Sequence, residues 1–425
     1  MNEDVSILEL TDVGALQSND KIPVGRPGTV TDNSTTIGAM KEYINAEPEA
    51  HIEALAELYG ARCDYELEQS SSPAFERSNP LVAQQYASHM GGYLFYVKNG
   101  TVYAAKLGSN WTSFEDGTAV TSTIRANTET MIHVPKCHFK ANGKRMRFGG
   151  INPIDGGNFF DAPHWVGAYQ MDNNGHSRPD VGSGHSKTMT AFWELAQAIH
   201  SDFGLANYEF QNFINALYQA IYGNLNSESV LSNGNSRSAD AWDSYRDLAH
   251  GAADSLGNGS GCVAAVDGAG VTRYVTKLCG FEDLFGKLWE FRPGIRFYMD
   301  NDTRYAVVYS GNQVSNSAQG RIISDVLQSA SGQYTTEMEL GEHWDMLPKA
   351  VGGSDSTYYC DGYWASTGGE LLVVGGNADS GSLCGLACGD SYSGFSNSSG
   401  SLGARLAFYG EPVIVSGAEM VAMMA

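Results

Sequence analysis

The segment from Leu371 to Phe408 decides how this chain is interpreted: LLVVGGNADSGSLCGLACGDSYSGFSNSSGSLGARLAF. It begins with four apolar residues followed by two glycines, a pattern typical of a buried strand. It ends with a second short apolar run, 404–408. Between these runs, 18 of the 27 residues from Gly376 to Leu402 are Gly, Ser, Asn or Asp. Such a segment cannot form a core element, and we predict a loop surface presented on a rigid scaffold.

Two interpretations compete for this loop surface. A flexible linker has a similar content of Gly and Ser. Linkers seldom carry apolar anchors, however, and this segment contains Leu383, Leu386 and Phe395 and has a predicted strand at each end. Small polar side chains around a tyrosine are also typical of binding loops. The composition therefore favours a recognition surface.

Short blocks along the chain carry a family resemblance. In the C-terminal part they are Leu347-Pro348, Gly352-Gly353-Ser354, Tyr358-Tyr359-Cys360-Asp361, Val374-Gly375-Gly376, Gly381-Ser382-Leu383-Cys384-Gly385-Leu386 and Leu402-Gly403-Ala404-Arg405-Leu406. Earlier blocks are Met131–Lys136, Trp165–Tyr169 and Gly280–Phe291. Together they resemble the variable proteins of diversity-generating retroelements. That family comprises phage tail adhesins and related surface proteins with a C-type lectin fold.

The resemblance implies a function and a site. In that family the framework residues stay fixed, while the positions between them are diversified by adenine-directed mutagenesis and form the ligand-binding face. The chain would then be a tail adhesin that binds a host cell-surface receptor, either protein or glycan. It would act as a homotrimer joined to other tail proteins through its N-terminus. The implied ligand-facing residues are Asn377, Asp379, Ser380, Cys388, Asp390, Tyr392, Ser393, Phe395, Asn397 and Ser399.

Composition narrows the possible partners. The 425-residue chain has a formal net charge of −22, which argues against binding to nucleic-acid phosphates. It contains no apolar run long enough to span a membrane, and Met1 to Asp4 lack the basic and apolar regions of a secretory signal. We therefore expect no nucleic-acid partner and no membrane insertion. We expect synthesis in the bacterial cytoplasm and, from the resemblance, a place in the virion tail.

The expected fold class is α+β, in two or three domains. Residues 1–46 resemble the attachment segment of phage tail and virion fibre proteins, with short strands and a helix at 38–45. Residues 47–127 are interpreted as a helix that begins at Pro48, followed by a small β-rich region. Residues 128–425 form the expected C-type lectin-like domain, whose variable region is about 371–408.

Several elements are predicted from local patterns. Asn-Gly pairs at 99–100 and 142–143 predict two hairpins. The first lies within Tyr93–Leu107, and the second pairs Met131–Phe139 with Lys144–Phe148. Helices are predicted at 187–200 and 208–222, the latter between an Asn207 N-cap and Gly223. Residues 224–270 are interpreted as an extended loop or insertion.

The sequence lacks the usual motifs of catalysis and metal binding. His133 and His138 are five apart near a strand and would point to opposite faces. The run Asp300-Asn301-Asp302 is interpreted as a turn, because position 311 is Gly where a calcium-binding loop requires Glu. An isolated Arg405 in an apolar strand needs a buried partner, which assigns it to the framework. We expect no enzyme activity, no cofactor and no bound metal ion.

Two other functions stay open on the sequence. A structural virion tail protein would use the same domain only to contact neighbouring subunits. The formylglycine-generating enzymes, which are copper oxidases that act on a substrate cysteine, have a related fold and depend on a cysteine pair near the C-terminus. Cys384 and Cys388 resemble that pair superficially, but their spacing is C-x-x-x-C and the Arg-Gly-Gly-Ser-Trp block of that family is missing. Because the seven cysteines form no C-x-x-C or zinc pattern, we interpret them as small buried residues.

Overall fold

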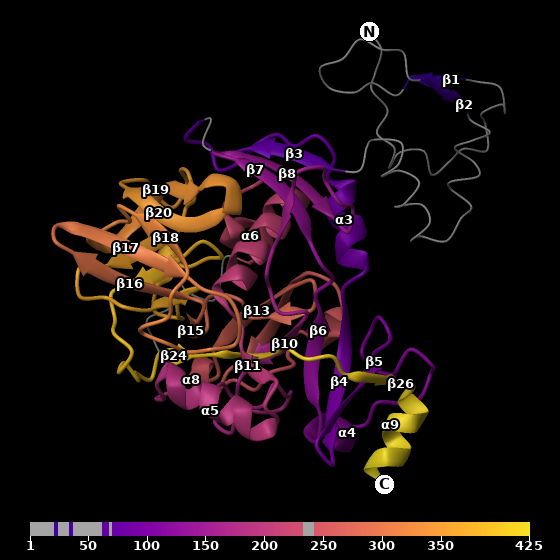
Figure 1. Cartoon of the computed structure of the whole chain (residues 1–425). Helices are drawn as coiled ribbons and strands as arrows, with labels where there is room; N and C mark the ends of the chain where they lie inside the picture. Colours follow the sequence, from indigo (N-terminus) through magenta and orange to yellow (C-terminus); the bar gives the residue numbers. More distant parts are fainter. Residues whose placement is uncertain (1–20, 24–33, 37–61, 68–69, 233–241) are drawn as a thin grey trace.

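The computed structural model describes residues 21–23, 34–36, 62–67, 70–232 and 242–425. In these ranges, helices are combined with mostly antiparallel sheets, which confirms the predicted α+β class. Helix α6 lies near the centre of the molecule, with β19 and β20 on one side and β7 and β8 on the other (Figure 1). No helix of the described part is long and apolar enough to cross a membrane.

One seven-stranded sheet combines strands from distant parts of the chain. In spatial order its strands are β11 (Phe203–Leu205), β25 (Arg405–Phe408), β10 (Trp165–Gln170), β6 (Glu129–His133), β4 (Gly91–Lys98), β5 (Thr101–Lys106) and β26 (Val413–Val415). Every neighbouring pair is antiparallel except β5 and β26. Because β4 and β5 pair into the sheet of β6, β10 and β25, one sheet crosses the expected boundary between residues 127 and 128.

The second seven-stranded sheet contains three strands of the segment from Leu371 to Phe408. In spatial order its strands are β20 (Asp345–Val351), β19 (Ala330–Leu340), β21 (Gly362–Ala365), β23 (Gly389–Ser391), β22 (Leu372–Val374), β15 (Trp289–Arg292) and β24 (Leu402–Gly403). The predicted strands at both ends of that segment are therefore present, as β22 and β25. They lie in different sheets, which ties the segment to two layers of the molecule.

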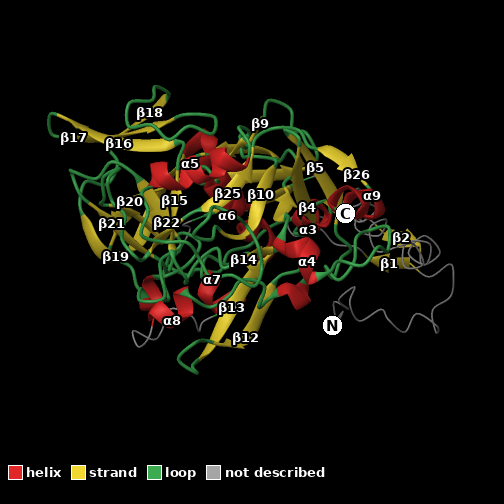
Figure 2. Cartoon of the chain, turned by 90° about the horizontal axis from the view of Figure 1, so that it is seen from below, coloured by secondary structure: helices red, strands yellow, loops and turns green. Residues whose placement is uncertain are grey.

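Four smaller sheets complete the strand structure of the described residues. One has four strands: β3 (Cys63–Glu66), β8 (Arg145–Gly150), β7 (His138–Asn142) and β9 (Asn158–Phe159). Two have three strands each: β12 (Gly261–Val266), β13 (Thr272–Leu278) and β14 (Phe281–Glu282) form one, and β16 (Ile295–Asp300), β17 (Thr303–Val308) and β18 (Arg321–Ser324) form the other. The fourth pairs β1 (Lys21–Pro23) with β2 (Ser34–Thr36). The β12–β13 and β16–β17 hairpins project from the body in different directions (Figure 2). The run from Asp300 to Asp302 forms the turn of the second hairpin, as predicted.

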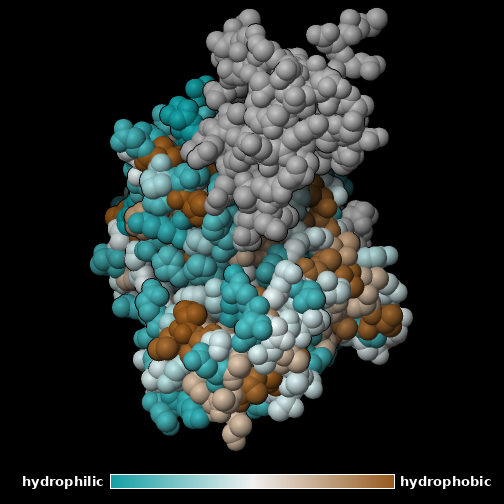
Figure 3. All heavy atoms as spheres, turned by 90° about the vertical axis from the view of Figure 1, so that its right-hand side faces the viewer, coloured by the Kyte–Doolittle hydropathy of each residue, from teal (hydrophilic) through white to brown (hydrophobic). Residues whose placement is uncertain are grey.

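The helices are short apart from α5 and α6. The described helices are α3 (Leu81–Ser88), α4 (Ser122–Ala126), α5 (Met189–Ile199), α6 (Tyr208–Tyr222), α7 (Ser227–Leu231), α8 (Trp242–Arg246) and α9 (Gly417–Met424), with 3-10 turns η3 (Asp254–Leu256), η4 (Gly341–His343) and η5 (Gly381–Leu383). Figure 3 shows the face that carries α9 and β26, where hydrophobic side chains form separate patches. The described parts of the expected loop or insertion at 224–270, residues 224–232 and 242–270, contain α7, α8, η3 and β12.

Helix α6 confirms both of its predicted ends. The Asn207 side chain accepts a hydrogen bond from the Phe210 N–H, and Gly223 ends the helix with φ of 60°, a conformation that favours glycine. Twelve of its 15 residues are buried, including polar residues on the face opposite the predicted apolar stripe. A helix buried on every side is a core helix, and here its amide side chains bind the surrounding backbone.

The two Asn-Gly hairpins are formed, with one difference. Asn99 and Gly100 both have positive φ and join β4 to β5, as a two-residue hairpin turn requires. At Asn142-Gly143 the paired strands are β7 and β8, from His138 to Gly150. The earlier residues of the expected hairpin form β6 in the first seven-stranded sheet. The chain therefore changes sheet between His133 and His138.

Little of the predicted N-terminal organisation can be compared with the structure. Lys21–Pro23 pairs antiparallel with Ser34–Thr36. The expected strand at 5–10 and the helices expected at 38–45 and from Pro48 lie outside the described residues.

Candidate ligand-binding surface

The scaffold of the candidate surface is the central pair of strands β22 and β23. Val373 pairs with Asp390, and Val374 with Gly389. Leu372 and Val374 pack into one apolar cluster, while Leu371 and Val373 pack into another. Successive side chains of a strand point to opposite faces, so β22 is buried on both faces and holds β23 in place.

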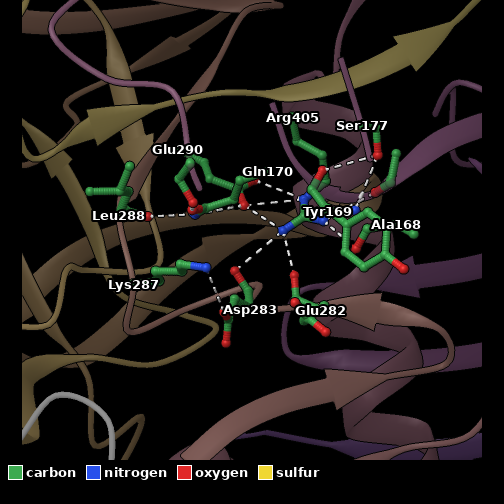
Figure 4. A network of polar contacts seen from close by, with 12 residues as sticks. Ala168, Tyr169, Gln170, Ser177, Glu282, Asp283, Lys287, Leu288, Glu290 and Arg405 are labelled. Atoms are coloured by element: carbon green, nitrogen blue, oxygen red, sulfur yellow. Dashed lines mark hydrogen bonds and ion pairs between the residues drawn. The ribbon is translucent and has the colours of Figure 1, made fainter. Parts of the chain in front are cut away.

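Arg405 links this sheet to the first one. Its guanidinium is fully buried and lies 2.6 Å from the Glu290 carboxylate of β15. It also donates to the carbonyls of Gly167, Ala168, Glu282 and Asp283, at 2.8 to 3.2 Å, and Figure 4 shows these groups converging on it. The structure thus confirms that Arg405 has buried carboxylate and carbonyl partners.

The Glu290 carboxylate is held in its charged form by this network. Burial alone would raise the pKa of Glu290, but the cations Arg405 and Arg292 outweigh burial and lower it below the ordinary value. Gln170 adds a donor to the same carboxylate at 3.2 Å. A buried charge that is paired and hydrogen-bonded in this way fixes the relative position of the elements that carry it.

A second buried cation, Arg304 of β17, is hydrogen-bonded to the last residue of β23. Its guanidinium donates to the Ser391 hydroxyl at 3.0 Å and to the Ser391 carbonyl at 2.6 Å. The Tyr363 hydroxyl also binds Ser391 Oγ, at 2.9 Å. Sequence reasoning missed Arg304, although it shows the same signal as Arg405: a cation within an apolar strand. This support holds the backbone at the point where the chain leaves β23 for the surface.

The connection from β22 to β23, residues 375–388, is anchored to the interior. The Leu386 carbonyl accepts hydrogen bonds from Gln211 at 2.7 Å and from Asn215 at 3.1 Å, both on α6. The Asp361 carboxylate accepts from the Ala387 N–H at 2.7 Å. A Cβ at Gly385 would lie 2.2 Å from an Asp361 oxygen. This part of the segment is therefore a framework. Its most accessible part is the turn at residues 377–380.

Three of the four predicted ligand residues of this connection, Asn377, Asp379 and Ser380, lie in the turn at 377–380. Asn377 is only 8% exposed, and its carboxamide oxygen accepts a hydrogen bond from Ser380 Oγ at 2.8 Å. Asp379 is exposed and Ser380 is half-buried. Within this group, Asp379 is thus the side chain most available to a ligand.

Cys388 does not lie on the surface that was predicted for it. It is 1% exposed and packs in an apolar cluster with Leu371 and Val373, because it directly precedes the buried strand β23. Burial also raises the pKa of its thiol well above the ordinary value. Cys384 is buried and its thiol donates to the Gly375 carbonyl at 2.9 Å. Both are free cysteines, and neither thiol is presented to a substrate.

The remaining six predicted residues are brought together by the turn that follows β23. Tyr392 is 58% exposed, and its N–H donates to the Asp390 carboxylate at 2.6 Å. The Asn397 amide donates to the Ser393 hydroxyl at 2.7 Å. The Ser399 hydroxyl contacts that of Ser401 at 2.6 Å. We call these six residues the β23 turn surface: Asp390, Tyr392, Ser393, Phe395, Asn397 and Ser399.

Residues outside the predicted set complete the β23 turn surface. Trp364 of β21 pairs in register with Asp390 and, like Phe395, packs half-buried against the apolar cluster beneath. The Ser366 hydroxyl donates to the Tyr392 carbonyl at 3.0 Å, and the Glu370 carboxylate accepts from the Phe395 N–H at 3.3 Å. Their contribution depends on the pairing of β21 with β23, which no local pattern in the sequence indicates.

The predicted ligand set is divided between two ends of the scaffold. Because β22 and β23 are antiparallel, the turn at 377–380 follows the end of β22, and the β23 turn surface follows the end of β23. Each strand has three residues, which corresponds to about 10 Å. Six of the predicted residues therefore follow or belong to β23, and a separate turn exposes Asp379.

Comparison with known proteins adds little to this geometry. No protein-family model and no curated protein sequence matches the chain. Among solved structures, the chain is similar to the Major Tropism Determinant U1 Variant, with 17% identity, a TM-score of 0.28 and coverage of 75% of this chain and 72% of the other. The M1 Variant of the same protein gives 16% identity, a TM-score of 0.29 and coverage of 77% and 73%. At these TM-scores the similarity carries no argument about function.

Electrostatics distinguish Asp390 from the other residues of the β23 turn surface. Burial raises the pKa of Asp390 to about 6, although the Tyr392 N–H and the Arg304 cation oppose this shift. Its carboxyl group therefore changes protonation just below neutral pH. It can donate a hydrogen bond to a ligand when protonated, whereas the carboxylate can only accept.

The described residues contain no group of three or more His, Cys, Asp or Glu that could hold a metal ion. His133 lies in the first seven-stranded sheet and His138 in the sheet of β3, β7, β8 and β9. The chemistry that the β23 turn surface offers is hydrogen bonding and aromatic contact.

Proposed function

We propose that this chain is a phage or prophage tail adhesin with a C-type lectin fold, which binds a host cell-surface receptor through the β23 turn surface. The observation that carries the proposal is the contrast between the two parts of the segment. A buried framework holds residues 375–388, while the turn that follows β23 presents an exposed tyrosine among small polar side chains.

The resemblance of the sequence to variable proteins of diversity-generating retroelements agrees with this contrast. Its framework positions include Gly375, Gly385 and Arg405, all buried. Gly375 has φ of 90°, and a Cβ there would meet the Leu284 carbonyl at 2.6 Å. These positions tolerate little change, whereas substitutions at Tyr392 or Ser399 would alter only exposed side chains. This is the division that a diversified binding surface requires.

The proposed binding mechanism is non-covalent capture. Tyr392 supplies aromatic contact area with few rotatable bonds, which is typical of the residues that dominate binding energy. Asp390, Ser393, Asn397 and Ser399 supply hydrogen bonds, and Trp364 and Phe395 hold the surface in place. Asp379, at the other end of the scaffold, would contact only a ligand that extends past both ends of β22 and β23. We exclude the buried Cys388 from the proposed site.

The proposal includes assembly in the virion. A homotrimer, joined to other tail proteins through the N-terminal part, would present three copies of the surface. Linking weak sites in this way raises the overall affinity through effective concentration. Sedimentation of the purified full-length chain tests this part: a mass three times 45.6 kDa is expected, and a monomer at micromolar concentration would contradict it.

Adsorption to bacterial cells tests the receptor-binding function. The fluorescently labelled full-length protein is mixed with a panel of bacterial strains, including the strain that carries the gene, and bound fluorescence is measured by flow cytometry. We expect saturable binding to a subset of strains, which unlabelled protein competes away. Protease or periodate treatment of the cells then distinguishes a protein receptor from a glycan. Absence of saturable binding to every strain would favour a purely structural tail protein.

Deep sequencing of the segment that codes for residues 377–401 tests diversification separately. In a growing population that carries the gene, we expect substitutions at the exposed positions of the β23 turn surface and at Asp379. Gly375, Gly385, Cys388 and Arg405 should remain unchanged. A uniform segment would favour an adhesin of fixed specificity.

A further inference from the structure

A pocket on a different part of the molecule has the properties of a second binding site. It has a volume of about 420 Å³, within the range of small-molecule sites. It lies where the start of α6 meets the ends of β17 and β9, the beginning of β18 and the η4 turn. Phe139, Phe159 and Tyr309 are its aromatic residues, and Asp161, Glu209, Arg321 and His343 are its other charged or titratable groups.

The charges in this pocket do not balance. The Arg321 guanidinium is occupied by Asp345, with two hydrogen bonds of 2.7 and 2.8 Å, and Asp345 also accepts from Tyr208. That pair is neutral as a unit. Asp161 and Glu209 remain, and among the described residues no cation lies within ion-pair distance of either carboxylate. Arg321 is the one arginine or lysine among the residues that line the pocket, and it is already paired with Asp345, which leaves the carboxylates of Asp161 and Glu209.

The helix dipole explains only in part why Glu209 stands at the start of α6. It is the second residue of α6, where a negative charge interacts favourably with the helix dipole. The Glu209 side chain is only partly exposed, however, and the Asp345 and Asp161 carboxylates lie close to it. Burial first, and then the Asp345 charge, raise the pKa of Glu209 to about 7 even though Arg321 opposes the shift. The ionised form therefore lacks a counter-charge.

The aromatic residues of the pocket support the same ligand chemistry. Phe159 is half exposed, and the Lys136 ammonium already lies 3.7 Å from its ring centre. The ring can thus accept a cation at its face, an interaction that stabilises ammonium groups. A second cation could bind between the ring and the two carboxylates.

We propose that this pocket binds an organic cation, specifically a primary ammonium group, between Asp161, Glu209 and the Phe159 ring. The ammonium could come from a lysine side chain or from an amino sugar, since both present the same group. This site is separate from the β23 turn surface and does not rest on the proposed adhesin function.

Four probes test this site on the full-length protein by ligand-observed NMR and calorimetry. They are N-acetyl-lysine amide, its neutral analogue N-acetyl-norleucine amide, glucosamine and glucose. We expect at least one amine to bind at millimolar concentration and its neutral partner to bind at least about tenfold more weakly, because the ammonium makes charged hydrogen bonds. Lysine amide binding without glucosamine indicates a protein source, and the reverse indicates an amino sugar.

Variants and pH separate binding from a structural role. Glu209→Gln and Asp161→Asn should each weaken amine binding at least about tenfold, while Glu194→Gln on the exposed face of α5 should not. For the natural chain, the affinity for N-acetyl-lysine amide, whose ammonium stays charged throughout this range, should rise about tenfold from pH 6 to pH 8 as Glu209 ionises, and Glu209→Gln should abolish most of this rise. Asp161, Asp345, Arg321, Tyr208 and His343 are the other titratable groups around Glu209. Equal binding of amines and neutral analogues, unchanged binding by both variants, or no binding of any probe would overturn the proposal.

Discussion

At the scale of single residues, buried arginines define the framework of the candidate surface. The sequence predicted a partner for Arg405 because an unpaired buried cation is too costly, and the structure supplies Glu290 and four carbonyls. The identity of these partners could not be predicted. Glu290 is 115 residues away in the sequence, and its strand reaches Arg405 only when two sheets pack together.

Replacement of Arg405 should therefore destabilise the fold strongly. Arg405→Met removes one of the two arginines paired with the Glu290 carboxylate and the donors that Arg405 supplies to four carbonyls. We expect a loss of about 3–5 kcal/mol in the free energy of unfolding, measured by urea denaturation. The control is Arg145→Met, whose exposed ion pair with Glu66 should contribute less than about 1 kcal/mol. Similar losses for both variants would contradict the assigned role.

The raised pKa of Asp390 predicts a pH-dependent stability. Because the folded-state pKa, about 6, lies above the ordinary 3.8, the folded chain binds this proton more tightly than the unfolded chain does. Asp390 therefore costs increasing stability as the pH rises from about 4 to about 6, and this cost persists above that range. Asp390→Asn removes the cost and keeps an oxygen that can accept from the Tyr392 N–H.

The Tm of Asp390→Asn should thus exceed that of the natural chain at about pH 8, and the difference should vanish at about pH 4. Thermal unfolding followed by circular dichroism measures both values. Asp300→Asn, in the exposed turn between β16 and β17, is the control and should show no such dependence. An Asp390→Asn variant that is less stable at the higher pH would contradict the assignment.

Among the helices and strands, a feature could be predicted when the residues that determine it lie close together in the sequence. The ends of α6 could be predicted because Asn207 and Gly223 act within one helical turn. The burial of its polar face could not, because Gln211 and Asn215 bind a carbonyl more than 170 residues later. The division of the predicted ligand residues between two ends of β22 and β23 also depends on strand pairing, which residue composition does not encode.

The amides of α6 should control the mobility of the framework connection. In the double variant Gln211→Ala with Asn215→Ala, the buried Leu386 carbonyl loses both donors, at a cost of about 1–3 kcal/mol. We expect faster hydrogen exchange within residues 376–388 and unchanged exchange within 391–401. Gln328→Ala, which removes an exposed bond to the Asp302 carbonyl, is the control. Unchanged exchange in 376–388 would show that other contacts anchor this segment.

At the scale of the whole molecule, the sheet that joins β4 and β5 to β25 and β26 determines the domain structure. The sequence suggested a domain boundary at residue 127 because a β-rich region precedes this point and the sequence blocks that resemble the family follow it. Sheets form between strands irrespective of their order, and the last strands of the chain complete one begun near residue 91. Residues on both sides of the expected boundary should therefore unfold together.

Calorimetry of two matched variants tests this cooperativity. Leu94→Ala lies before the expected boundary and Leu406→Ala after it, and both side chains are fully buried. Each should cost about 2–5 kcal/mol and lower the midpoint of the same thermal transition. Two transitions, each shifted by only one of the variants, would restore the boundary at 127.

A matched pair of tyrosine variants shows whether the β23 turn surface binds a receptor. Tyr392 is 58% exposed on that surface, whereas Tyr274 is 43% exposed on the projecting β12–β13 hairpin (Figure 2). The measurement is the apparent affinity of each Tyr→Ala variant for a strain that adsorbs the natural protein. We expect the apparent affinity to fall at least about tenfold for Tyr392→Ala, as for a binding hot spot. For Tyr274→Ala we expect it to fall less than about twofold. Unchanged adsorption of Tyr392→Ala, or an equal loss for both variants, would contradict receptor binding by the β23 turn surface.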